Sequence, residues 1–106
     1  MRIDMQHFLR LNWLLALIMF ALFAQAQTQL SIATGGTGGT YYPTGGAYGE
    51  LISKYIPGYS AAVEVTGASK ENVGLVSRGD ADMALALADT VYQAYTGTGT
   101  FEGYGH

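Results

Sequence analysis

The spacing of apolar and polar residues along this chain changes repeatedly between a period of two and a period of three to four. Residues 29–34 alternate between apolar and polar and are predicted to form a strand, as are residues 61–65. Residues 83–87 form a short continuous apolar run, which is typical of a strand covered on both faces. A helical pattern follows each strand. This order predicts an α/β fold with a parallel sheet of βαβαβ type and right-handed crossovers.

The first predicted helix has Pro43 in its first turn and ends at Pro57-Gly58. We expect it to pack through one apolar face, made of Ala47, Tyr48, Leu51, Ile52 and Tyr55. Gly45, Gly46 and Gly49 lower its helix propensity, so packing must hold it. Their lack of side chains predicts that this helix lies close to a neighbouring backbone.

The second predicted helix runs from an N-cap at Ser69 to about Arg78, with Gly79 as its stop signal. Its apolar positions, expected to face the core, are Val73, Leu75 and Val76. A third helix is predicted to begin near Asp89 and to include residues 90–95.

The N-terminus has the organisation of an export signal. Basic residues at Arg2 and Arg10 come before an apolar run, residues 11–23, and small residues follow at Ala24 and Ala26. Signal peptidase requires small side chains at such a site, so we predict a signal peptide over residues 1–26, cleavage after Ala26 and a periplasmic mature protein. The alternative is a membrane anchor, for which this run falls short of the roughly 20 apolar residues needed.

Composition restricts the possible partners of the mature protein. The chain has no cysteine, which fits an exported protein without disulfides. From Gln27 onward there are three basic and seven acidic residues, a net charge of −4. Three scattered cations cannot form the basic face that nucleic acid requires, so nucleic acid is excluded as a partner.

Catalysis is also unsupported by the residue content. His7 lies in the predicted signal and His106 is the final residue, so neither has partners for metal binding or acid–base chemistry. We therefore expect no enzyme activity, no cofactor and no metal.

Binding in a parallel sheet is expected at the carboxyl ends of the strands, where loops lead into helix N-termini. Free N–H groups and partial positive charge at these termini favour an anion. We predict a site for a small organic acid or an amino acid. Its expected residues are Thr37, Gly38, Gly39, Thr40 and Tyr41 after the first strand, Ser69 and Asn72 after the second, and Asp89 after the third.

Other interpretations of the glycine-rich loop fit less well. A phosphate-binding loop needs lysine after its last glycine, and no lysine occurs before Lys54. A dinucleotide fingerprint beginning at Gly36 would need glycine where Tyr41 stands. The remaining alternative is that these glycines only form turns.

Several side chains have two possible roles. Tyr41 either stacks on a ligand or packs beneath the loop, and packing is favoured for Tyr42. Asp89 either caps a helix, which is favoured, or contacts a ligand amine. Asp80 and Asp82 resemble a carboxylate pair, but their place before the third strand favours a role in the turn.

Four segments carry a resemblance to a known family. Residues 30–43 read LSIATGGTGGTYYP, and the later segments are residues 65–69 (VTGAS), residues 79–82 (GDAD) and residues 95–99 (YTGTG). The chain resembles the TAXI family, the extracytoplasmic solute receptors of tripartite ATP-independent periplasmic (TRAP) transporters. The resemblance covers essentially all of the mature chain. It implies a two-lobed type II periplasmic binding fold that closes on its ligand and delivers it to membrane permease subunits.

The chain departs from this family in length and at one motif position. Members are roughly three times longer than the mature chain, as two lobes of ordinary domain size require. Residues 27–106 are therefore expected to be the first half of lobe one, and the alternative function is a truncated exported domain with only a structural or interaction role. Ala68 stands where a second glycine often occurs, which is tolerated unless the position needs a positive φ.

Overall fold

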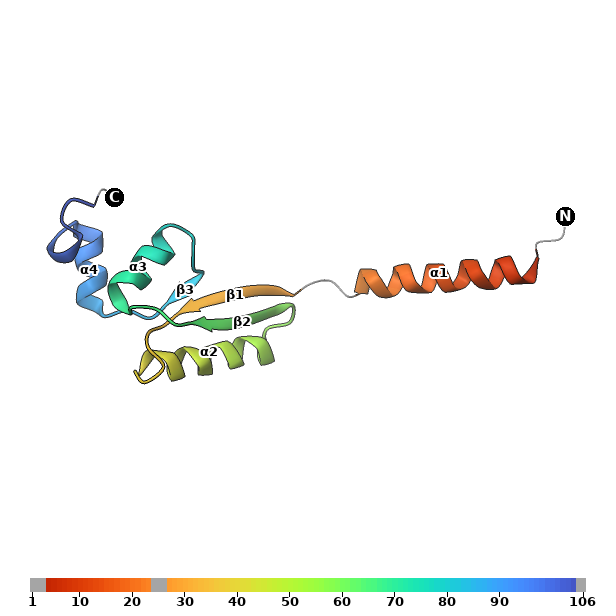
Figure 1. Cartoon of the computed structure of the whole chain (residues 1–106), viewed down its shortest axis with the longest axis horizontal. Helices are drawn as coiled ribbons and strands as arrows, with labels where there is room; N and C mark the ends of the chain where they lie inside the picture. The colour runs from red at the N-terminus through yellow and green to blue at the C-terminus, as the bar shows by residue number, and fades with distance from the viewer. Residues whose placement is uncertain (1–3, 24–26, 105–106) are drawn as a thin grey trace.

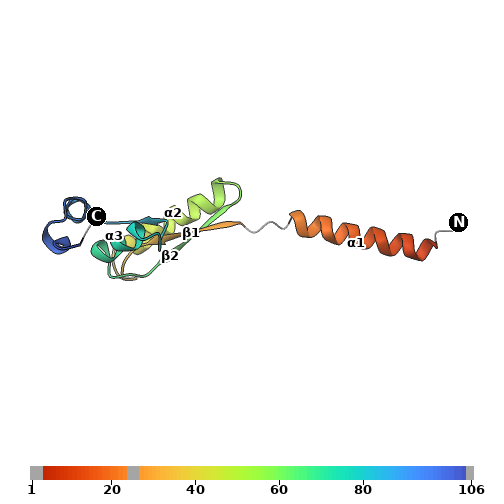
Figure 2. The same ribbon diagram turned by 90° about the horizontal axis from the view of Figure 1, so that it is seen from above.

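A computed structural model describes residues 4–23 and 27–104 of the chain. Its elements follow one another along the chain as α1 (Met5–Phe23), β1 (Thr28–Ala33), α2 (Tyr41–Tyr55), β2 (Tyr59–Glu64), α3 (Ser69–Ser77), β3 (Met83–Ala84), α4 (Ala88–Thr96) and the 3₁₀ turn η1 (Gly99–Phe101). The strands and the helices α2 to α4 form one α/β unit (Figures 1 and 2).

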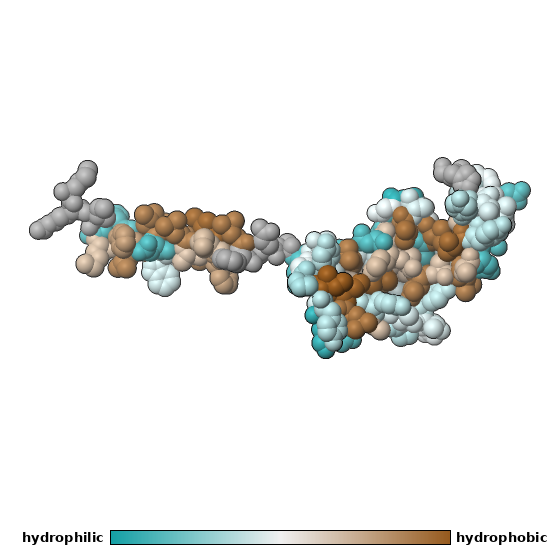
Figure 3. Space-filling view, turned by 180° about the vertical axis from the view of Figure 1, so that it is seen from behind, coloured by the Kyte–Doolittle hydropathy of each residue, from teal (hydrophilic) through white to brown (hydrophobic). Residues whose placement is uncertain are grey.

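The N-terminal helix α1 is exposed from Met5 to Leu22, and apolar side chains cover much of its surface (Figure 3). Residues Met5–Leu22 are long and apolar enough to cross a membrane, a test that a signal sequence also passes. The apolar run was predicted to be too short for an anchor. The helix begins earlier, at Met5, and Phe8 and Leu9 extend its apolar surface, so length alone does not exclude one. The predicted cleavage site at Ala26 lies outside the described residues.

The three strands pair in parallel in the order β2-β1-β3, which confirms the predicted α/β fold class. Ile32 of β1 is opposite Val63 of β2 and opposite Met83 of β3. The third strand is shorter than the predicted 83–87. After Ala84 only the N–H of Leu85 continues the pairing, donating to the carbonyl oxygen of Ala33 at 3.1 Å.

The central strand β1 is covered on both faces. Ile32 and Ala33 point to opposite faces of the sheet, and their exposed fractions are 2% and 0%. The helix α2 lies on one side of the strands and α3 on the other (Figure 1). The crossover from β1 to β2 and the crossover from β2 back to β3 run in opposite directions across the sheet, and if both are right-handed their helices must lie on opposite faces.

The helix α2 packs through its glycines, which corrects the predicted apolar face. Gly45 and Gly49 are buried, and a Cβ atom at Gly49 would lie 3.1 Å from the carbonyl oxygen of Ala61. The predicted close approach to a neighbouring backbone is therefore confirmed. The expected face was wrong in large part, because side chains there would hold the helix away from the sheet. Ile52 is half-buried, whereas Ala47, Tyr48, Leu51 and Tyr55 are exposed.

The helix α3 begins one residue earlier than predicted. Ala68 is the N-cap, and Ser69 is the first helical residue. Ser69 is not free to cap, because its Oγ accepts a hydrogen bond from the N–H of Leu87 at 3.0 Å. Val73 and Leu75 are half-buried and Val76 is exposed, so only part of the predicted core face is covered.

Gly79 follows the end of α3 with φ of +78°, as the predicted stop signal requires. The last helix of the unit, α4, begins at Ala88 with Leu87 at the N-cap position. The favoured interpretation of Asp89 as a cap was therefore wrong by two residues. Asp89 lies in the first turn, where its Oδ1 accepts the N–H of Thr90 at 2.7 Å.

Candidate functional site

A cavity of about 380 Å³ opens at the carboxyl ends of the three strands. Its walls come from the loop after β1, the loop after β2 and the start of α4. The lining residues are Gly35, Gly36, Gly39, Thr40, Tyr41, Ala68, Ser69 and Leu87. Segments that are distant in the sequence thus meet at one place.

The topology of the sheet explains why a hollow forms there. The loop after β1 leads to α2 on one side of the sheet, and the loop after its neighbour β2 leads to α3 on the other. Loops that turn in opposite directions leave a crevice between them, which is where open α/β sheets bind ligands.

Three helices begin at this cavity. The first hydrogen bonds within α2, α3 and α4 are donated by the N–H groups of Thr44, Asn72 and Val91. The N–H groups before them in each first turn have no intrahelical acceptor. Together with the partial positive charge of each N-terminus they favour an anion. None of the lining residues has a charged side chain, so the positive character of the cavity comes from the backbone.

Hydroxyl groups add to the donors at the cavity wall. Thr40 is the N-cap of α2, but its side chain makes no capping hydrogen bond. Among the hydrogen bonds of the described residues, the Oγ1 of Thr40 takes part in none, so it can donate to a ligand. Ser69 differs, because its Oγ already accepts the N–H of Leu87, which leaves its proton and one lone pair for a ligand.

A buried polar cluster lies beneath the cavity and fixes its loops. The side-chain amide of Asn72, with 0% exposure, donates to the carbonyl oxygens of Thr34 at 2.6 Å and Leu85 at 2.7 Å. Its Oδ1 accepts a hydrogen bond from the hydroxyl of Thr66. Asn72 therefore joins residues that follow β1, β2 and β3.

Thr34 completes this cluster from the side of β1. Its hydroxyl donates to the carbonyl oxygen of Glu64 at 2.6 Å, and the side chain is fully buried. Neither this role nor that of Thr66 was predicted. A threonine at the end of an apolar strand is the only signal in the sequence that could have suggested it.

The predicted site residues fall into two groups. Gly39, Thr40, Tyr41 and Ser69 line the cavity together, along with Gly35 and Gly36, which were not among the expected contacts. The second group does not line it. Thr37 and Gly38 form the exposed turn before α2, Asn72 is buried beneath the cavity, and Asp89 is exposed on α4.

The two tyrosines at the start of α2 are both half-buried, and only Tyr41 lines the cavity. Asp80 and Asp82 lie just before β3, at the amino end of the sheet. Asp82 accepts the backbone N–H of Ser31 at 2.8 Å, and Asp80 pairs with Arg78 at 3.1 Å. Within the described ranges, no three acidic or histidine side chains come together as a metal site would require.

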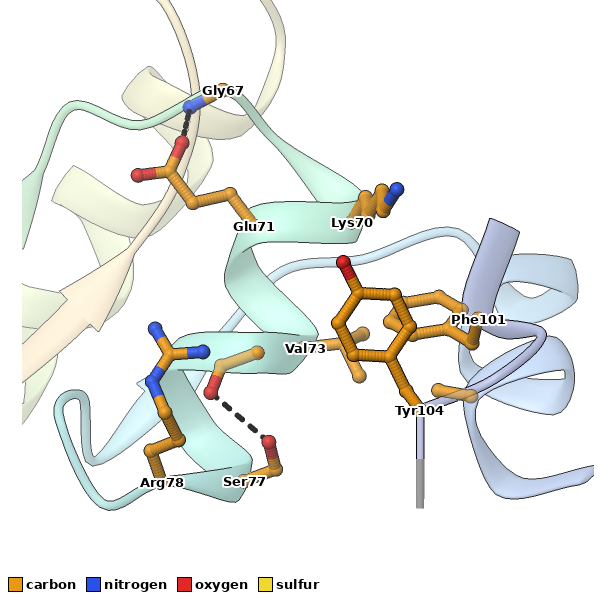
Figure 4. A pocket seen from close by; sticks show the side chains of 10 residues that line it. Gly67, Lys70, Glu71, Val73, Ser77, Arg78, Phe101 and Tyr104 are labelled. Atoms are coloured by element: carbon orange, nitrogen blue, oxygen red, sulfur yellow. Dashed lines mark hydrogen bonds between the residues drawn. The ribbon is translucent and has the colours of Figure 1, made fainter. Parts of the chain in front are cut away.

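A larger hollow, of about 890 Å³, lies between α3 and the segment around η1. Figure 4 shows Phe101 and Tyr104 beside Val73. The ring centroids of Phe101 and Tyr104 lie 6.3 Å apart. Lys70 and Tyr104 also line this hollow, with the Nζ of Lys70 5.9 Å from the centroid of the Tyr104 ring. Three of its other polar side chains bond within the protein. Glu71 accepts the N–H of Gly67, Ser77 bonds the carbonyl oxygen of Gly74, and Arg78 pairs with Asp80. The smaller cavity is the better ligand site, because three helices begin there and, among the described residues, the N–H groups of Tyr41 and Ser69 and the hydroxyl of Thr40 donate to no other group.

Comparison with known families agrees with a binding role. The NMT1-like family matches residues 32–106, a range that includes every residue of the cavity. The chain belongs to the NMT1-like family. This is a family of periplasmic solute-binding proteins rather than enzymes, so the chain has a solute-binding role outside the cytoplasm. Membership in the NMT1-like family also implies a transporter partner in general terms, and the apolar helix α1 fits the export signal that such a protein needs.

Proposed function

We propose that this NMT1-like protein is a receptor for a small organic anion or an amino acid, which it delivers to the permease of a TRAP-type secondary transporter. The observation that supports this most directly is the meeting of three helix N-termini around one cavity without charged side chains. Such an arrangement stabilises a carboxylate through backbone dipoles and N–H donors.

The size and lining of the cavity favour a small ligand. A volume of about 380 Å³ is near the lower end for small-molecule sites, which span roughly 300–1,000 Å³. The carboxylate would bind the N–H groups at the starts of α2 and α3, with Thr40 as a side-chain donor. The half-buried ring of Tyr41 offers an apolar surface for the rest of the ligand.

The remaining predicted residues take more distant roles in this proposal. Thr37 and Gly38 form the rim of the site, and Asn72 acts by holding the loops. Asp89 lies in the first turn of α4, and a contact with the ammonium group of an amino-acid ligand is the role we propose for it. The TRAP permease as partner rests on the motif of residues 30–43 and its resemblance to the TAXI receptors.

The experiment that tests this function is calorimetric titration of the full chain and its Thr40→Val variant with glutamate and succinate. Removal of the hydroxyl while its shape is kept should cost about 1.5 to 3 kcal/mol, the range for a hydrogen bond to a charged group. The affinity should fall roughly tenfold to more than a hundredfold.

Asp80→Asn is the control, because Asp80 lies at the other end of the sheet and should leave affinity unchanged. If Asp80→Asn abolishes binding while Thr40→Val has no effect, the site is elsewhere. If neither anion binds the unmodified chain, receptor function for such ligands is contradicted and the structural role of an exported domain is favoured instead.

A further inference from the structure

Ala68, at the junction between β2 and α3, has a backbone conformation that alanine rarely adopts. Its φ and ψ are +69° and −147°, and no other non-glycine residue in the described ranges has a positive φ. This region of conformational space is populated almost only by glycine. A side chain is therefore present where the backbone would accept glycine more easily.

Hydrogen bonds on both sides of the residue hold this conformation in place. The N–H of Ala68 donates to the Oγ1 of Thr66 at 3.1 Å, and its carbonyl oxygen accepts the N–H of Asn72 at 2.9 Å. Since these bonds involve only backbone atoms of residue 68, they do not require a methyl group. Nothing in the hydrogen bonding explains why the residue has a Cβ atom.

The methyl group lines the proposed ligand site. Ala68 lines the cavity together with Gly35, which lies across from it in the loop after β1. A Cβ atom built on Gly35 would be 3.6 Å from the Cβ of Ala68, so the two residues are already close. Ala68 thus narrows the space between the loop after β1 and the N-terminus of α3.

We propose that Ala68 is a specificity-determining residue, whose methyl group limits the size of the ligand beside its carboxylate. The inference rests on the proposed function, because it assumes that a carboxylate binds at the starts of α2 and α3. The carbon next to that carboxylate would then lie against the methyl group of Ala68, on the side that faces the cavity. Ligands with an additional methyl group on this carbon would collide with the Ala68 side chain.

The test uses two pairs of probes that differ by one methyl group, succinate with 2-methylsuccinate and glutamate with 2-methylglutamate. The full chain and its Ala68→Gly variant are titrated with all four compounds. The chain should prefer the unmethylated member of at least one pair. Ala68→Gly should shift that preference toward the methylated member by about tenfold or more, the discrimination typical of one methyl-sized group in a pocket.

A ratio of affinities within one protein separates selectivity from stability, because a change in the folded fraction affects both members of a pair equally. Ala62→Gly is the matched control, since Ala62 is exposed on β2 and does not line the cavity. It should leave the ratio unchanged.

The possible results separate the two proposals. Binding with the same ratio in the unmodified chain and in Ala68→Gly would overturn the role of Ala68 and leave the receptor function standing. A shift of equal size in Ala62→Gly would overturn it too. Failure of all four compounds to bind either protein would contradict the proposed function, and the inference with it.

Discussion

The side-chain amide nitrogen of Asn72 lies 2.6 Å from the carbonyl oxygen of Thr34, and this hydrogen bond connects α3 to the end of the central strand. The same nitrogen donates to Leu85 after β3, while the Oδ1 of Asn72 accepts from Thr66 after β2. One side chain therefore sets the spacing of the three strand ends that support the candidate site.

Asn72→Asp should destabilise the fold strongly. Aspartate has almost the same shape but cannot donate to the carbonyl oxygens of Thr34 and Leu85, which would lose this donor in a largely buried place. We expect the free energy of unfolding to fall by about 2 to 4 kcal/mol, since each unsatisfied buried group costs about 1–3 kcal/mol. Urea denaturation followed by circular dichroism measures the change.

Ser77→Ala provides the control on the same helix. Its Oγ bonds the carbonyl oxygen of Gly74 at the exposed surface, so its loss should change stability by about 0.5 kcal/mol or less. Equal stability of Asn72→Asp and Ser77→Ala would show that the buried amide contributes little.

Gly45→Ala and Gly46→Ala should change stability in opposite directions. A Cβ atom at Gly45 would overlap the Cγ2 of Thr34, well inside 3.0 Å, whereas none at Gly46 would meet another atom within 4 Å. Gly46→Ala should stabilise α2 by up to about 1 kcal/mol through helix propensity. Gly45→Ala should destabilise by about 1–3 kcal/mol, the cost of overpacking. Thermal unfolding of both variants tests this, and a stabilised Gly45→Ala would contradict the packing of α2 on β1.

The order of elements could be predicted from the sequence because each strand and helix has its own local period. Which face of α2 packs could not, because a glycine does not count as apolar in any periodicity. Tyr48, Leu51 and Tyr55 have helical spacing, yet each is more than half exposed, since contact is made through Gly45 and Gly49.

The site was predictable to a similar extent. Because each helix is predicted to begin shortly after a strand, the sequence correctly places Thr40, Tyr41 and Ser69 at one edge of the sheet. The sequence also indicated Asn72 as a ligand contact, and here the prediction differs from the structure. Whether an asparagine points into a cavity or into the protein depends on the distance between strands, which no local pattern encodes.

Ala68→Gly should stabilise the fold, apart from any effect on selectivity. Replacing the only non-glycine residue of positive φ in the described ranges removes backbone strain of about 1–3 kcal/mol, and the greater flexibility of glycine in the unfolded chain returns part of this. We expect the free energy of unfolding, measured by urea denaturation, to rise by about 1 kcal/mol. Ala47→Gly, in the exposed middle of α2, should instead lower the free energy of unfolding by about 1 kcal/mol. A loss of stability in both variants would show that Ala68 is not strained.

The length and composition of α1 suit both a signal sequence and a membrane anchor. The small residues at Ala24 and Ala26 favour cleavage after Ala26. When the chain is expressed with its own leader in a Gram-negative host, the periplasmic fraction should contain a protein that begins at Gln27. Intact-mass measurement identifies this terminus. Ala26→Phe should block processing, because a large side chain does not fit the shallow pocket of the peptidase, and it should leave the full chain in the membrane fraction. Recovery of the unmodified chain at full mass in the membrane would show that α1 is an anchor.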